Sequence, residues 1–369
     1  DGAGLRALLS NSDRYKEDSR KFRRKVFNEE DWLDFRSSGR LYYNLKTMFT
    51  SGVIRGLWIE VGSVIVVATT CWLANLLVLS GQLEPFSIPA DGSFLFALPT
   101  LPFTLSSPAL ALLLVFRTNT VYARWNEARM AWAKIENHCI NIARQGVNYL
   151  EEDQREEHIR RIIALAHITK RHFQADEGAD EYLVEKLTSL LGKKESERMM
   201  AARGRPLQAL LDIARVVRRS GVIDGSTKAR FDLHLDEIHQ ALVTCERIRR
   251  NPVPLVYTRH TGRFLGLWIL LLPFALVKEL NESFIVIPTC GLVAVFFFGI
   301  EELGIQIEEP FSIMPLQDIV VCIERRLRRM LAYDATVRED PEIGADADPL
   351  APATDHSDVK PFLSAKYKG

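Results

Sequence analysis

The sequence has no excess of charge of either sign. Among its 369 residues, 47 are Lys or Arg and 47 are Asp or Glu, so the formal net charge is zero. Proteins that bind nucleic acid present clustered positive charge to the phosphates, and this chain carries no net positive charge to do so. We therefore expect no nucleic-acid partner.

The sequence also lacks cysteine and histidine spacings that hold metals. It has five cysteines and no CxxC pair. These are Cys71, Cys139, Cys245, Cys290 and Cys322. Such isolated thiols are typical of reduced or buried cysteines, not of a disulfide framework or a zinc site. We expect no bound metal.

Motifs of catalysis and nucleotide binding are absent as well. The chain contains no GxGxxG before a helix, no GxxxxGK[ST], no GxSxG and no HExxH. His158, His167 and His172 are spaced by nine and five residues, so a helix does not place them together as ligands. The sequence therefore predicts neither an enzyme nor a cofactor.

What the chain does have is a set of long apolar runs. The first, residues 56–80, reads GLWIEVGSVIVVATTCWLANLLVLS and is long enough to cross a hydrocarbon core. The second, residues 94–116, reads FLFALPTLPFTLSSPALALLLVF. Two more, residues 262–277 and 284–300, are separated only by KELNES and predict a hairpin of two membrane helices.

The second run contains three prolines, Pro99, Pro102 and Pro108, which we expect to interrupt it. Broken helices persist in a membrane only where protein or water satisfies the freed backbone groups, so this segment is a candidate lining of a pore or cavity. The alternative is a short loop followed by a shorter buried helix. At Arg117 the run turns polar without a Gly or Pro stop, which predicts one helix that leaves the bilayer.

The rest of the chain indicates a helical soluble part. Residues 117–251 show apolar positions at three-and-four spacing and no alternation of period two. The predicted fold is therefore all-α, a polytopic membrane protein with four transmembrane helices per subunit and a helical soluble domain. The loops between paired runs hold almost no Lys or Arg, so the long segments and both termini face the same, inner side.

The predicted organisation has six parts. They are a basic amphipathic segment that lies on a membrane surface or is an ordinary solvated helix (1–50), transmembrane helices 1 and 2 (51–116), a helical soluble domain (117–261), transmembrane helices 3 and 4 (262–300), a further helical soluble segment (301–335) and a disordered tail (336–369).

Three long stretches have a distinctive pattern: PFTLSSPALALLLVFRTNTVYARWNEARMAW, NPVPLVYTRHTGRFLGLW and IPTCGLVAVFFFGIEELGIQIEEPF. They resemble the bestrophin family, in particular its bacterial, plant and algal branch. The first is similar to the family's second membrane helix. The second is similar to the segment at the inner end of the pore, and the third to the fourth membrane helix. The resemblance extends over residues 30 to 330.

The resemblance implies a homopentamer around a central pore with two constrictions. Aligned through the Arg124-Trp125 pair, the neck residues are Pro108, Leu112 and Phe116, whose spacing of four places them on one helix face. A ring of such side chains gates by dewetting. The inner aperture corresponds to Val253, between two prolines. The alternatives are that the neck residues pack against neighbouring helices and that Val253 is a core residue in a loop.

The sequence departs from animal bestrophins after Pro310-Phe311. Animal members carry a cluster of acidic residues there that binds calcium, whereas this chain continues SIMPLQD with Asp318 alone. Calcium requires six or more oxygen ligands, so the resemblance does not extend to calcium gating. We expect Glu301, Glu302, Glu308 and Glu309 to pair with basic residues near the membrane.

The function implied by the resemblance is an anion channel for chloride, with bicarbonate or nitrate as further anions. Its partners would be the other copies of itself in the homopentamer, membrane lipid, and chloride and other monovalent anions. The likeness to thylakoid members places it in the chloroplast thylakoid membrane with both termini in the stroma, or in another cellular membrane. The alternatives are a cation-selective channel of the same family and a membrane-anchored scaffold that does not conduct.

Overall fold

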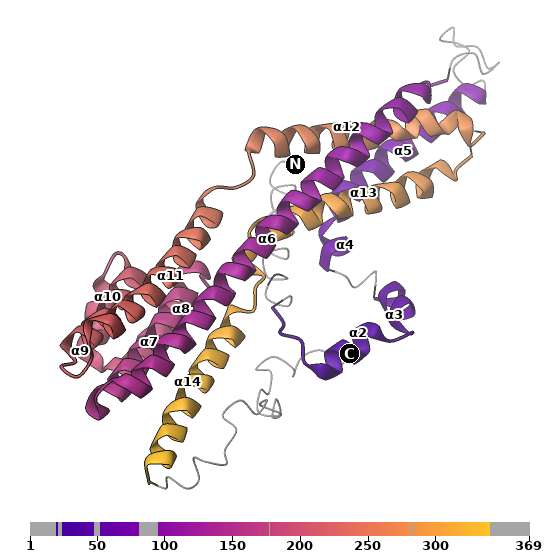
Figure 1. Ribbon diagram of the computed structural model, residues 1–369. Helices are drawn as coiled ribbons and strands as arrows, with labels where there is room; N and C mark the ends of the chain where they lie inside the picture. The colour runs from indigo at the N-terminus through magenta and orange to yellow at the C-terminus, as the bar shows by residue number, and fades with distance from the viewer. Residues whose placement is uncertain are drawn as a thin grey trace. The chain divides into compact units, whose positions relative to one another are not determined.

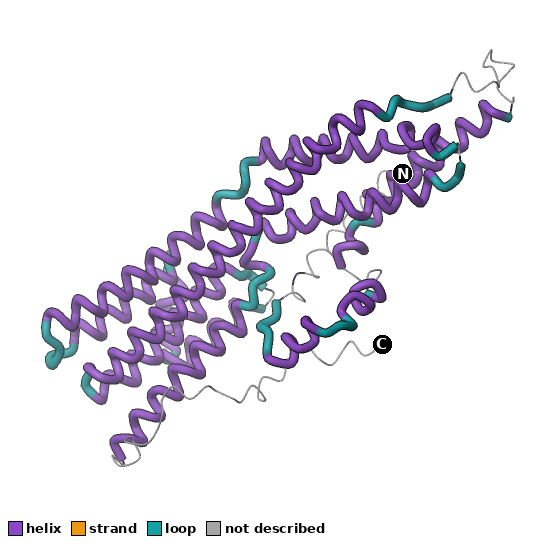
Figure 2. Tube along the Cα trace, turned by 45° about the vertical axis from the view of Figure 1, so that its right-hand side comes forward, coloured by secondary structure: helices purple, strands orange, loops and turns teal. Residues whose placement is uncertain are grey.

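The computed structural model describes residues 20, 24–47, 52–80, 95–176, 178–281 and 283–339. Throughout these ranges the regular structure is helical (Figures 1 and 2). The predicted turn-rich connection at residues 81–93 lies outside the described residues, as do most of the N-terminal twenty-three residues and residues 340–369 of the predicted tail.

The helices follow one another in a simple order. They are α2 (Glu29–Arg36), α3 (Arg40–Lys46), α4 (Gly52–Gly56), α5 (Trp58–Leu79), α6 (Leu101–Tyr149), α7 (Glu152–Phe173), α8 (Ala179–Leu191), α9 (Lys193–Ala201), α10 (Arg205–Arg219), α11 (Gly225–Arg250), α12 (Leu255–Glu279), α13 (Val286–Glu308), a 3₁₀ turn (Pro310–Ser312) and α14 (Leu316–Glu339). Helix α14 extends past residue 336, where the sequence predicted the tail to begin.

Four helices of the described part are long and apolar enough to cross a membrane, namely α5, the first part of α6, α12 and α13. This agrees with the four predicted crossings, and the protein is an integral membrane protein. The described part of the chain divides into two compact units, and these four segments belong to the first, which comprises the described residues within 20–24, 42–133 and 241–314.

The first unit is held together by an apolar cluster to which all four spans contribute. Helices α5, α12 and α13 pack against one another, and α6 adds Leu110 and Leu114. The cluster consists of Val64, Ala68, Leu110, Leu114, Leu265, Ile269, Leu272, Val286, Cys290 and Ala294. Because lipid is as apolar as these side chains, close packing and dispersion hold the spans together rather than exclusion from water.

The second unit comprises the described residues within 25–41, 134–240 and 315–339. Its centre is α7, against which α8, α10 and α14 pack. Residues 162–170 of α7 are all buried, which is the pattern of a helix that is surrounded by neighbours on every side. His158 and His167 are among the buried residues of α7, as expected for packed histidines.

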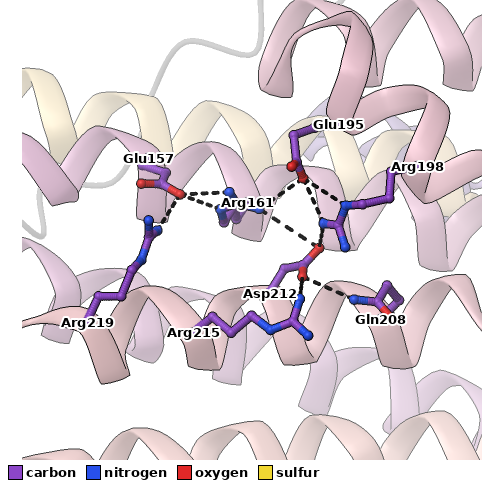
Figure 3. A network of polar contacts seen from close by, with 8 residues as sticks. All are labelled: Glu157, Arg161, Glu195, Arg198, Gln208, Asp212, Arg215 and Arg219. Atoms are coloured by element: carbon purple, nitrogen blue, oxygen red, sulfur yellow. Dashed lines mark hydrogen bonds and ion pairs between the residues drawn. The ribbon is translucent and has the colours of Figure 1, made fainter.

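A network of charged side chains joins α7, α9 and α10 in this unit (Figure 3). Asp212 is 3% exposed and accepts hydrogen bonds from Arg198 (2.5 Å), Arg215 (3.0 Å) and Gln208 (3.1 Å). Glu157 accepts from Arg161 and Arg219 at 2.8 Å each. The Arg partners hold the pKa of the Glu157 carboxyl below its usual value against the opposing effect of burial.

Helix α2 begins with a reciprocal cap. The Asn28 side chain accepts from the Asp31 amide (2.8 Å), and the Asp31 side chain accepts from the Asn28 amide (3.1 Å). Beside it, Phe27, Trp32 and Phe35 form edge-to-face ring contacts while remaining about half exposed. These exposed aromatic rings stand among basic residues, and the membrane-surface role of the segment stays a prediction.

Candidate functional site: helix α6 and the Pro252–Pro254 turn

Helix α6 is continuous for 49 residues, from Leu101 to Tyr149. The prediction of a single helix that runs from apolar into polar sequence is confirmed. The prediction that prolines interrupt the second apolar run is wrong for Pro102 and Pro108, whereas residues 95–100, which include Pro99, are not helical. Pro99 precedes the helix and Pro102 lies in its first turn, where backbone N–H groups have no intrahelical partner.

Pro108 is the one proline inside the helix, and a hydroxyl compensates for it. Proline has no N–H to donate to the carbonyl of Thr104, one turn earlier. The Ser107 hydroxyl donates to that same carbonyl at 3.1 Å. The neighbouring Ser106 hydroxyl accepts from Trp268 Nε1 of α12 at 3.1 Å. The serines at the apolar start of α6 therefore satisfy polar groups that lipid would leave without partners.

The predicted neck residues lie on an exposed face of α6. Leu112 and Phe116 are each 54% exposed and Pro108 is also exposed, whereas Leu110 and Leu114 are buried in the apolar cluster. The packing of the single chain thus fixes the rotation of the helix. It leaves the face with Pro108, Leu112 and Phe116 uncovered by the chain's own residues in the described part.

The segment before α6 is fastened by a buried amide that the sequence analysis did not single out. Asn75 of α5 is fully buried, and its side chain pairs with the backbone of Phe96 in both directions. The Phe96 amide donates to Asn75 Oδ1 at 2.7 Å, and Asn75 Nδ2 donates to the Phe96 carbonyl at 3.3 Å. An Asn within an otherwise apolar run is the signal that could have revealed this contact.

Directly after the exposed Phe116, a buried ion pair joins α6 to α13. Arg117 is 4% exposed and pairs with Glu301. Arg117 lies close to the backbone of α13, since a Cβ at Gly304 would stand 3.5 Å from Arg117 Nε, an ordinary van der Waals contact. One turn along, Gln306 donates to Glu302 at 2.7 Å, with both side chains buried.

The other two predicted acidic residues also have partners. Glu309 pairs with Arg20 at 3.3 Å. The expectation that these acidic residues pair with basic ones is thus confirmed for Glu301 and Glu309, whereas the carboxylate of Glu308 accepts a backbone amide. Among the described residues no group of three or more His, Cys, Asp or Glu side chains is arranged to hold a metal ion.

Arg124 binds the carbonyl groups at the ends of two helices. Its guanidinium donates to the carbonyls of Glu308 (2.9 Å) at the end of α13, of Asn251 (2.6 Å) just past α11, and of Ile248 within the last turn of α11. Helix C-termini expose carbonyls and carry partial negative charge. A guanidinium there donates hydrogen bonds to these carbonyls and places a positive charge beside the negative one. Arg124 is therefore a junction between α6, α11 and α13.

The predicted aperture residue lies at this junction. Val253 lies in the short connection between α11 and α12, and it is 9% exposed. Its amide donates to Glu308 Oε1 at 3.1 Å. Within the single chain the Val253 side chain is thus packed, while its flanking prolines are exposed.

Comparison with known proteins identifies the family. Residues 32–329 match the family described as Bacterial/Fungal Bestrophin protein. The chain belongs to the bestrophin family. The extent of this match agrees with that of the resemblance noted in the sequence, and the family is one of channels and not of enzymes.

Proteins similar to this chain include channel proteins of plants and cyanobacteria. The chain is 30% identical over 339 residues to Voltage-dependent chloride channel 1, chloroplastic, of Arabidopsis thaliana, covering 90% of this chain and 80% of that protein. It is 30% identical over 255 residues to a voltage-dependent anion channel-forming protein of Nostoc, covering 65% of this chain and 80% of the other.

Solved bestrophin structures have the same fold. A bacterial bestrophin homolog from Klebsiella pneumoniae superposes with a TM-score of 0.61 at 26% identity, covering 72% of this chain and 98% of that one. A second structure of the Klebsiella homolog gives a TM-score of 0.64 at 24% identity. The all-helical fold with four membrane spans is thus shared with that protein.

Proposed function

We propose that this chain forms an anion-selective channel, in which five copies surround a pore and α6 of each copy contributes to a hydrophobic neck. Two relatives at 30% identity carry the names of a chloride channel and an anion channel-forming protein. The observation that carries the proposal is the uncovered face of α6. A membrane helix that packs Leu110 inward and leaves Pro108, Leu112 and Phe116 outside the core can present that face to a central axis.

The chemistry of that face favours anions with weakly held hydration shells. Leucine and phenylalanine offer no partner for the ion, so an ion that crosses the ring loses part of its hydration. Chloride loses water more readily than small cations do. Small residues beside the face, Ser106, Ser107, Ala109 and Ala111, allow neighbouring helices to approach closely.

We further propose that the pore narrows again at Val253, with the Pro252–Pro254 turn contributed by every copy. Chloride is the proposed main ion, and bicarbonate and nitrate are further candidates. Two relatives are named as chloroplastic, which supports a place in the thylakoid membrane with the termini in the stroma, where anion flow would balance proton movement or supply bicarbonate.

Flux through the purified full chain in liposomes tests the proposal. We expect chloride efflux with a permeability well above that of potassium, and a detergent-solubilised mass of five chains. A potassium permeability above that of chloride would indicate a cation channel of the same family. A folded monomer or dimer without any flux would indicate a membrane-anchored scaffold, because the neck requires a ring of subunits.

A further inference from the structure

The turn at residues 252–254 has a single backbone donor. Its outer residues are both proline, which has no N–H, so the Val253 amide is the one N–H group in the three residues. That amide donates to Glu308 Oε1 at 3.1 Å. A carboxylate acceptor makes this hydrogen bond stronger than an ordinary backbone contact.

Glu308 is itself held by the helix that forms the proposed neck. Its main-chain carbonyl accepts from Arg124 Nε at 2.9 Å, and Arg124 Nη1 donates to the carbonyl of Asn251 at 2.6 Å, next to the turn. The contacts close a ring, from Arg124 to Glu308, from Glu308 to Val253, and along the chain through Pro252 to Asn251 and Arg124. Asn251, just before the turn, and Val253, at its centre, are thereby both connected to the Arg124 side chain of α6.

From this ring we propose that Arg124 and Glu308 are positioning residues that fix the Pro252–Pro254 turn and so set the width of the inner aperture. The proposal rests on the proposed function in assigning the aperture to Val253. Glu308 acts through the Val253 amide and keeps the valine side chain packed, at 9% exposed. Without the Glu308 carboxylate, the Val253 amide loses its side-chain acceptor. The Val253 side chain then leaves its packed position more often.

Substitutions at position 308 distinguish the effect of the carboxylate charge from that of the hydrogen bond to the Val253 amide. A glutamine at position 308 retains an oxygen that accepts from the Val253 amide, whereas an alanine does not. Glu309 is a matched control, because it is the next residue, carries the same carboxylate and pairs with Arg20 instead of with the turn.

The test is the rate at which a cysteine at position 253 reacts with a membrane-impermeant thiol reagent. It uses the full chain in detergent or nanodiscs, with Val253→Cys placed in a Cys322→Ser background, since the other four native cysteines are buried. We expect slow labelling in this background and about tenfold faster labelling with Glu308→Ala. A tenfold change is what the loss of one hydrogen bond to a charged group produces. Glu308→Gln and Glu309→Ala should label at the slow rate.

Equal labelling rates in all four proteins would overturn the proposal, and so would fast labelling with Glu308→Gln. Arg124→Lys should also accelerate labelling, because a single ammonium nitrogen does not reach the three carbonyls that the guanidinium binds through separate nitrogens. Because labelling requires no conduction, its result is independent of whether the chain is a channel. If the chain conducts, Glu308→Ala should in addition change the permeability of large anions relative to chloride severalfold, and unchanged permeability ratios would contradict the aperture role.

Discussion

Gly146 of α6 lies directly against the imidazole of His158 on α7. A Cβ at position 146 would stand 2.8 Å from His158 Nε2 and closer still to Cδ2, a distance that real Cβ atoms do not adopt. The ring cannot move aside, because His158 is fully buried, donates from Nε2 to the Ile142 carbonyl at 3.3 Å and packs edge-on against Phe231.

Gly146→Ala should therefore destabilise the second unit by about 1–3 kcal/mol, the usual cost of overpacking a core. Thermal unfolding of the full chain in detergent measures this. Gly225→Ala is the matched control, since a Cβ there meets nothing within 4 Å. A double-mutant cycle with His158→Ala should show coupling between the two sites, and equal melting temperatures for Gly146→Ala and the control would contradict the contact.

The buried His158 also predicts a pH dependence. Burial lowers the pKa of His158 from 6.5 to about 4, because the charged ring would lose its hydration. Between these values the unfolded chain binds a proton that the folded chain does not, so the free energy of unfolding decreases as pH falls from 6.5 to about 4, by ~3 kcal/mol over the full range. Burial lowers the pKa of His167 too, with the same sign.

The measurement is the unfolding midpoint between pH 7 and 5. In this window the titration of Glu324 does not contribute. The pKa of Glu324 is lowered to about 2, so its contribution to the free energy of unfolding is lost only as pH falls below 4.5. His158→Gln should flatten the dependence, whereas His239→Gln, at an exposed position, should leave it unchanged. A slope that His158→Gln does not alter would show that other groups cause it.

The charge network of Figure 3 predicts a strong contrast between two of its acidic residues. Asp212→Ala removes a 3% exposed carboxylate that accepts hydrogen bonds from Arg198, Arg215 and Gln208, which should cost about 1–3 kcal/mol of unfolding free energy. Glu195 is 38% exposed, so Glu195→Ala should cost below about 1 kcal/mol. Comparable losses in the two variants, measured by thermal unfolding, would contradict this account.

The large features of the fold could be predicted from the sequence because they depend on local composition. Long apolar runs predicted the four spans. The lack of a Gly or Pro stop at Arg117 predicted that α6 is continuous. Proline was misjudged because its effect depends on context. Two of the three prolines fall before or at the helix start, and a serine hydroxyl satisfies the carbonyl that Pro108 leaves free.

The contacts that hold the candidate site were not predictable in the same way. The hydrogen bonds of the site join residues that are far apart in the chain, namely Asn75 with Phe96, Arg124 with Asn251, and Glu308 with Val253. A single sequence marks such residues only as polar groups in apolar or proline-rich surroundings. The positions of Pro108, Leu112 and Phe116 came from family resemblance together with helical spacing, and their role in the neck remains a prediction.

The most direct test of the central claim is the reversal potential of single channels in planar bilayers under a KCl gradient. It should be compared for the wild type, for the double variant Leu112→Ala with Phe116→Ala, and for Leu267→Ala, whose side chain is 62% exposed on a different span, α12. We predict reversal near the chloride equilibrium potential, altered conductance or gating in the double variant, and wild-type currents from Leu267→Ala. Reversal near the potassium equilibrium potential, or no conductance from folded protein, would contradict the account of an anion channel.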